Sequence, residues 1–180
     1  FSTIRSVLNL EQEKEPTMIL DFGAASTKLY VVERGSVKSS HTVNRGSQDI
    51  TTTIARSLRI SSKEAEILKR TVGLSSKENR DLYDSIFLIL DYIFVESNRV
   101  MREFREKNQK DLSKMMLIGG GSSMRGFAEA AAANLQADVS AGDPFSKVEA
   151  PAFVSEVLRN SGPEFATAVG LALRGLSIEG

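Results

Sequence analysis

Cysteine is absent from this chain of 180 residues, and histidine occurs once, at His41. The lack of cysteine excludes disulfides, thiolate metal sites and catalysis by a thiol, and it is compatible with a reducing cytoplasm. A single histidine on a predicted strand gives no support to a histidine-based metal site or catalytic triad. The candidate chemistry therefore rests on carboxylates, lysines, hydroxyls and backbone groups.

An excess of charge of either sign is also missing, since 23 basic and 23 acidic side chains cancel. A surface that binds nucleic acid is usually basic, so we predict no nucleic-acid partner. The most apolar run, residues 86–94, is interrupted by Asp91. It is far shorter than the roughly 20 residues of a membrane-spanning helix, so we predict no span.

Apolar periodicity and turn residues predict an alternation of strands and helices. The predicted strands are 18–20, 28–33, 37–43, 115–118 and 137–140, and the predicted helices are 47–58, 62–70, 77–110, 124–135, 151–159 and a last one after Gly162-Pro163. Residues 34–36 predict a turn between two antiparallel strands, and Ser61 with Glu64 predicts a capping box. The pattern favours an α/β fold with helices around a sheet.

Asp21 ends the first predicted strand, directly before the small residues of DFGAAST. A carboxylate at such a turn can hold Mg²⁺ through water while the N–H groups of the turn approach a phosphate. The alternative is that Asp21 only caps the turn, because Asp and Gly are common turn residues.

Three consecutive glycines, residues 119–121, follow the predicted strand MMLI and precede a helix. Their bare backbone would let a ligand lie close to a helix N-terminus. The alternative is a flexible loop between strand and helix.

Glu66 and Lys69 are three residues apart and therefore lie on one face of a predicted helix. The carboxylate can accept hydrogen bonds from sugar hydroxyls, and the ammonium can contact a base or ribose. The alternative is an exposed ion pair, which contributes only a few tenths of a kcal/mol.

The order of these motifs is more specific than any one of them. The order is a D-x-G hairpin, RGSQDITTTIARSLRISSKEAEILKRTVG, a long helix, LIGGGSSMRGF and GPEFATAVGLAL. In this order the sequence resembles the second half of the actin-like ATPases over nearly its whole length. The sequence motif of residues 46–69 is similar to that of the FtsA/PilM family. The C-terminus of PilM, the type IV pilus assembly proteins, is similar to DPFSKVEAP followed by GPEFATAVGLALRGL.

The resemblance implies a ribonuclease H-like α/β fold: a mixed β-sheet with flanking helices and a small inserted α/β lobe. It assigns residues 1–15 to an interdomain connector helix and linker, 16–45 plus 112–180 to subdomain IIA, and 46–111 to subdomain IIB. It also implies that ATP and Mg²⁺ are the ligands. By resemblance Asp21 would orient Mg²⁺ or the attacking water. Gly23 and Ser26 would face the phosphates, and Glu66 and Lys69 would contact the ribose and the base. Gly119, Gly120 and Ser122 would contact the adenosine.

Two departures from the family pattern bear on activity. Ala24 and Ala25 stand where hydrolytic relatives have glycines, and Lys28 stands where they have an acid. We therefore expect ATP binding and at most slow hydrolysis. The second departure is that no phosphate-1 loop or first connecting helix precedes residue 1, so we interpret the sequence as the C-terminal half of a longer protein that holds half of the nucleotide site.

The resemblance further implies an assembly protein that is cytoplasmic and peripheral to the inner membrane. Its implied partners are a PilN-like inner-membrane protein, bound through the missing first half, and other pilus assembly proteins. Two alternatives stay open at this point. One is an FtsA-like cell-division protein, and the other is a sugar or acetate kinase of the same superfamily. The A-E-x-x-K motif argues against the kinase.

Overall fold

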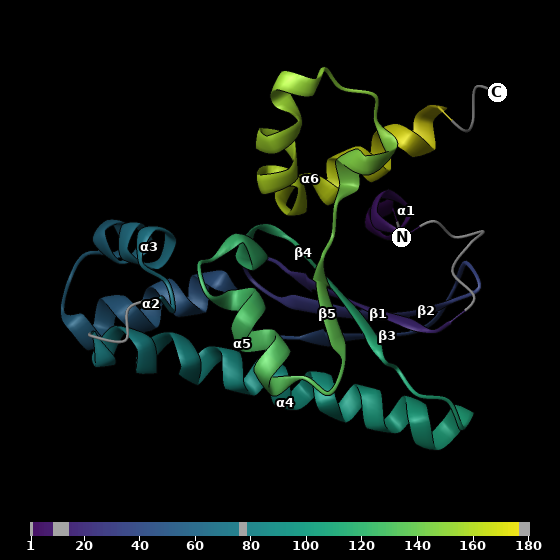
Figure 1. Cartoon of the computed structure of the whole chain (residues 1–180). Helices are drawn as coiled ribbons and strands as arrows, with labels where there is room; N and C mark the ends of the chain where they lie inside the picture. The colour runs from purple at the N-terminus through teal and green to yellow at the C-terminus, as the bar shows by residue number, and fades with distance from the viewer. Residues whose placement is uncertain (1, 9–14, 76–78, 177–180) are drawn as a thin grey trace.

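A single mixed sheet forms the centre of the molecule in a computed structural model that describes residues 2–8, 15–75 and 79–176 (Figure 1). Its strands are β1 (Thr17–Phe22), β2 (Thr27–Glu33), β3 (Ser36–Val43), β4 (Lys114–Ile118) and β5 (Asp138–Ala141). The strand order is β3-β2-β1-β4-β5. The first three strands pair antiparallel, whereas β4 lies parallel to both β1 and β5. The predicted mixed sheet is confirmed.

The hairpin between β2 and β3 follows from local sequence. Arg34 and Gly35 both have positive φ, 49° and 71°. Two consecutive residues with positive φ match the twist of antiparallel strands in a two-residue turn. The predicted turn is confirmed, and β3 is left at the edge of the sheet.

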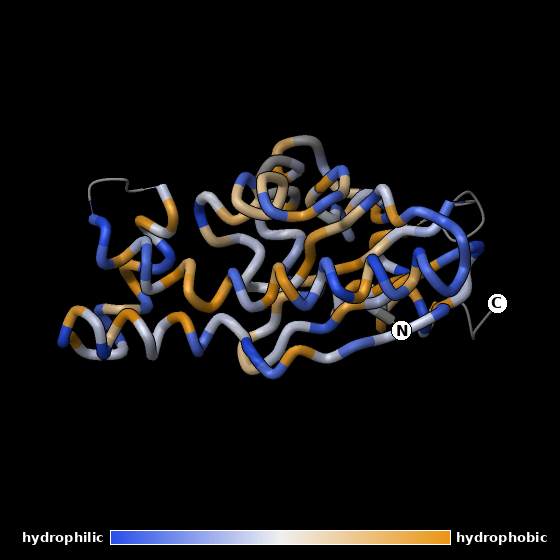
Figure 2. The backbone as a smooth tube through the Cα atoms, turned by 90° about the horizontal axis from the view of Figure 1, so that it is seen from below, coloured by the Kyte–Doolittle hydropathy of each residue, from blue (hydrophilic) through white to orange (hydrophobic). Residues whose placement is uncertain are grey.

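Helices cover both faces of the sheet. They are α1 (Ser2–Val7), α2 (Ser47–Leu58), α3 (Ser62–Thr71), α4 (Arg80–Asn108), α5 (Phe127–Asn134) and α6 (Ser155–Leu176), with short 3₁₀ turns η1 (Gly120–Ser123), η2 (Pro144–Lys147) and η3 (Ala152–Val154). Hydrophobic and hydrophilic residues alternate along the helices, as expected for amphipathic helices on a sheet (Figure 2). No helix in the described ranges is both long and apolar enough to cross a membrane.

Alternation along β1 divides the core into two clusters. Met18, Leu20 and Phe22 face the larger cluster, to which α2, α3, α4 and α5 contribute. Ile19 faces the smaller cluster with residues of α1 and α6. Successive strand side chains point to opposite faces, so one six-residue strand joins both layers.

The inserted segment differs from the prediction. An α/β lobe was expected in residues 46–111, but among its described residues the regular elements are α2, α3 and α4, all helical. These helices pack on one another and share the larger core with the sheet, so their apolar faces are buried without further strands. The division into a connector and two subdomains stays a prediction.

The C-terminal helix also differs from the prediction. Separate helices were expected on either side of Gly162-Pro163, but α6 continues through Pro163. Figure 1 shows that α6 changes direction sharply, and an internal proline accounts for a bend because it lacks an N–H and its ring crowds the preceding turn. The carbonyl of Pro163 accepts a hydrogen bond of 2.8 Å from the Gly119 amide. The bend is thereby tied to the glycine-rich loop.

Candidate functional site

Several segments far apart in the sequence converge around one pocket of about 350 Å³. The lining residues are Ala24, Ser47, Glu66, Lys69, Arg70, Gly120, Gly121, Ser123, Met124 and Glu164. They come from the β1–β2 turn, the start of α2, α3, η1 with the residue after it, and α6. The volume lies within the range of small-molecule sites.

Asp21 lies at the end of β1, beside the point where β4 gives way to the glycine-rich loop. The parallel register pairs Asp21 with Ile118, so both strands end at the same edge of the sheet. Burial raises the pKa of the Asp21 carboxyl, and the positive charge of Lys28 only partly offsets this. A nearby cation would favour the charged form of this carboxylate.

Gly119 fits against Asp21 because it has no side chain. A Cβ there would lie 2.6 Å from Asp21 Oδ1 and 2.6 Å from the Phe22 carbonyl oxygen, and its φ of +87° also favours glycine. The glycine thus permits the close approach of the loop to the end of β1.

The β1–β2 turn is held by the start of α2. The amides of Ser47 and Gln48 donate to the carbonyls of Gly23 and Ala24, at 3.0 and 2.9 Å. The amides of Ala24 and Ala25 have no hydrogen-bond acceptor among the described residues, and both residues are exposed. Consecutive free backbone N–H groups at a turn are suited to an anion such as phosphate.

Glu66 and Lys69 form a network with Thr51 rather than an exposed ion pair. The Lys69 ammonium lies 2.7 Å from Glu66 Oε2 and donates to Thr51 Oγ1 at 2.9 Å and to the Ser47 carbonyl at 3.1 Å. Lys69 is only 6% exposed. An ammonium has three donors, and all three are used, so Lys69 positions α3 against α2 and has no free donor for a ligand.

Glu66 keeps its charge over most of the pH range. Burial alone would raise the pKa of Glu66, but hydrogen bonds from Arg70, Lys69 and Thr51 outweigh it and lower the pKa to about 2. The side chain is 35% exposed at the pocket. A carboxylate has about four acceptor positions, and the three donors occupy one each, so about one position remains for a hydroxyl group of a ligand.

The glycine-rich loop forms the 3₁₀ turn η1, and the helix that was predicted to start at residue 124 begins at Phe127. Gly121 packs on Phe22, where a Cβ would lie 2.5 Å from the ring, whereas the nearest neighbour of a Cβ on Gly120 is Glu164 Cγ at 3.8 Å. Gly120 therefore faces open space in the pocket. The Ser122 hydroxyl donates to the Gly119 carbonyl at 2.7 Å and stabilises the loop itself.

The structure brings together some of the predicted site residues and not others. Glu66, Lys69 and Gly120 line the pocket, whereas Asp21, Gly23, Ser26, Gly119 and Ser122 do not. Their predicted roles toward a ligand stay predictions. No group of three or more His, Asp or Glu side chains in the described residues is arranged to hold a metal ion.

Sequence reasoning missed several lining residues, namely Ser47, Arg70, Ser123, Met124 and Glu164. Arg70 is four residues from Glu66, so the helical spacing that pairs Glu66 with Lys69 could also have indicated Arg70. Glu164 had no local pattern to indicate it, because it reaches the pocket through the bend of α6 at Pro163.

Comparison with known proteins adds the family context. A family model described as "Type IV pilus assembly protein PilM" matches residues 1–176. A solved structure of a PilM-PilN type IV pilus biogenesis complex is similar at 31% identity and a TM-score of 0.85, over 97% of this chain and 50% of that chain. The cell division protein FtsA of Rhizobium meliloti (strain 1021) is 25% identical over 178 residues, 86% of this chain and 39% of its own length.

More distant structures share the fold alone. MreB5 of Spiroplasma citri, solved bound to AMPPNP, is 17% identical with a TM-score of 0.70, over 99% of this chain and 57% of that chain. This chain thus spans about half the length, or less, of the FtsA and PilM relatives it matches.

Proposed function

The chain belongs to the PilM family of type IV pilus assembly proteins, and on that premise we propose that it is the nucleotide-binding half of an ATP-dependent assembly scaffold. The observation that carries the proposal is the convergence of the β1–β2 turn, α3 and the glycine-rich loop on one pocket. These segments offer free amides, a charged carboxylate and bare backbone on different walls of that pocket.

Each part of the pocket suits a different part of ATP. The free amides of Ala24 and Ala25 suit a phosphate, and Glu66 suits a ribose hydroxyl. Gly120 leaves room for a flat base above the loop. The half-buried Asp21 carboxylate would hold Mg²⁺ through water, and the ion would supply charge neutralisation for the triphosphate.

We propose a switch rather than an efficient enzyme. The methyl groups of Ala24 and Ala25 restrict the approach of phosphates to the turn, and Lys28 lies opposite Asp21 in the register where an acid would be needed. Hydrolysis is therefore slow at most. ATP occupancy acts by changing how the protein binds its partners.

The partner follows from the same family context. We propose that the whole protein binds a PilN-like protein through its other half, together with further pilus assembly components, because a similar structure is that of a PilM-PilN complex. We therefore propose a peripheral location at the cytoplasmic side of the inner membrane.

The 180-residue chain should bind MgATP weakly compared with the full-length product of its reading frame. Holding a triphosphate requires donors from both halves of the site, and this chain supplies one. Isothermal titration calorimetry on both proteins measures the difference. Submicromolar affinity of the 180-residue chain would contradict the idea of a shared site.

Two substitutions in the full-length protein separate the roles of metal and base. Asp21→Asn keeps the size and removes the charge, so Mg²⁺-dependent binding should weaken at least about tenfold while binding in EDTA is unchanged. Gly120→Val puts a branched side chain into the pocket and should weaken binding in both conditions. Gly120 has no positive φ and open space beside it, so the fold should be retained.

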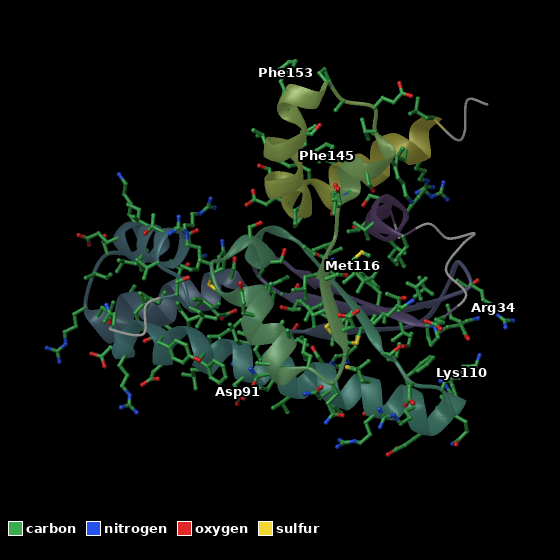
Figure 3. All side chains as sticks on the ribbon, in the orientation of Figure 1. Arg34, Asp91, Lys110, Met116, Phe145 and Phe153 are labelled. Carbon is green, nitrogen blue, oxygen red and sulfur yellow. The ribbon has the colours of Figure 1, made fainter. Side chains whose placement is uncertain are left out.

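Titration of a fluorescent ATP analogue with Mg²⁺ or EDTA gives both results. Asp91→Asn is the matched control, because Asp91 is exposed on α4, away from the pocket (Figure 3). Wild-type binding by both site variants in both conditions would remove Asp21 and Gly120 from the nucleotide site.

A further inference from the structure

A second groove lies between the edge strand β3 and the C-terminal part of α4. Its volume is about 320 Å³. The lining residues are four consecutive ones of β3, Lys38, Ser39, Ser40 and His41, and one side of α4, Val100, Glu103, Phe104, Lys107 and Asn108. The groove is separate from the pocket described above and has no lining residue in common with it.

The outer edge of β3 is open to another strand. β3 is the last strand of the sheet on this side, so every second residue directs its N–H and C=O away from β2. In the part of the chain that the structure describes, only the pairing with β2 gives hydrogen bonds to the main chain of Ser36–Val43. Eight residues at about 3.3 Å each give an edge of roughly 26 Å.

The side chains beneath this edge are arranged for an extended chain. Ser39 and His41 pair with Val31 and Leu29, which face the larger core, so both point to the α4 side of the sheet. Val100 and Phe104 of α4 supply an apolar floor. An added strand would place alternate side chains over this floor.

The charges of the groove favour an acidic ligand. Lys38 and Lys107 have no ion-pair partner within 4 Å among the described residues. The one acid of the groove, Glu103, is already paired with Arg99 at 3.1 Å. Arg34 adds a basic side chain at the same end of the molecule, where Lys110 is already paired with Glu33 (Figure 3).

We propose that this groove, formed by β3 and α4, binds an extended acidic peptide segment of a partner protein as an added strand. Main-chain hydrogen bonds to β3 would supply affinity, and Lys38 and Lys107 would select acidic side chains. A second copy of this chain is a poorer fit, because antiparallel pairing of two β3 strands would gather the lysines of both copies along one seam. The proposal does not depend on nucleotide binding.

A fluorescein-labelled probe peptide tests the proposal. In the probe peptide, Glu and Val alternate along one face of the strand, and Thr occupies the positions of the other face. Fluorescence anisotropy with the 180-residue chain should show saturable binding, and hydrogen exchange should slow at residues 36–43 when the peptide is present. A version with Lys for Glu should bind at least about tenfold more weakly, and a version with Pro for Thr, which lacks those N–H donors, should not bind.

Variants of the protein locate the contact. The double substitution Lys38→Glu with Lys107→Glu should weaken binding of the acidic peptide about tenfold, since two exposed ion pairs are lost. Lys63→Glu with Arg102→Glu makes the same charge change at exposed residues outside the groove. The affinity of this double variant for the acidic peptide should stay within about twofold of the wild type. Equal loss in both double variants, binding of the Pro peptide, or no binding by the acidic peptide would overturn the proposal. Concentration-dependent dimerisation that slows hydrogen exchange at residues 36–43 without any peptide would overturn it in favour of a second copy.

Discussion

Gly46→Ala is expected to lower the free energy of unfolding by about 3 kcal/mol, although it adds one methyl group. A Cβ on Gly46 would lie 2.2 Å from the Ala24 carbonyl oxygen and 2.7 Å from the Ala25 carbonyl carbon. Both are backbone atoms, so the turn can yield only by breaking its bonds to Ser47 and Gln48. Urea unfolding followed by circular dichroism measures the loss.

The cause at this position is steric and not conformational. Gly46 has φ of −143°, which any residue adopts, so strain from a positive φ plays no part. Gly175→Ala is the control, because a Cβ there meets nothing within 4 Å and alanine favours a helix. The free energy of unfolding of Gly175→Ala should equal that of the wild type or be slightly higher. Equal stability of Gly46→Ala and the wild type would show that the turn is not held by close contact with α2.

Lys69→Met is expected to be the second most damaging change, with a loss of about 2–3 kcal/mol in the free energy of unfolding. Methionine fills a similar volume but donates no hydrogen bond. The Ser47 carbonyl, Thr51 and Glu66 would each lose a partner where Lys69 is buried. Nucleotide binding should weaken as well, because the same contacts fix α3 beside the β1–β2 turn.

Acid unfolding gives an independent readout of this network. The pKa of Glu66 is about 2 in the folded protein, below the usual value of about 4.3 in an unfolded chain. A lowered pKa stabilises the fold above the unfolded value, and this contribution is lost as the pH falls from about 4.3 toward 2. Lys69→Met should therefore raise the pH of the acid-unfolding midpoint.

Arg70→Met is the matched control, since Arg70 also pairs with Glu66, at 2.8 Å. The hydrogen bond from Arg70 also lowers the pKa of Glu66, but the Arg70 side chain is 71% exposed, so water screens the pair. Its loss should cost at most about 1 kcal/mol. A larger effect for Arg70→Met than for Lys69→Met would place the stabilising charge on the surface and contradict the buried network.

Features that depend on neighbouring residues could be predicted from the sequence. Alternating side chains predicted the strands, and Arg34-Gly35 predicted the hairpin turn. The capping box predicted at Ser61 is present: its hydroxyl accepts from the Glu64 amide at 3.2 Å, and the Glu64 carboxylate accepts from the Ser61 amide at 2.9 Å. Motif order also gave the family, because the spacing of the motifs along the chain is itself sequence information.

The contacts of these residues, in contrast, depend on how distant elements pack together. As an isolated helical pair, Glu66 and Lys69 are indistinguishable from a surface ion pair, and α2 makes Lys69 a buried residue by placing Ser47 and Thr51 against it. Glu164 is 40 residues or more from every other lining residue of the pocket and reaches it through the bend at Pro163. Periodicity and capping depend on residues within a few positions of each other, whereas these contacts depend on how distant helices pack on the sheet, and no short pattern records that.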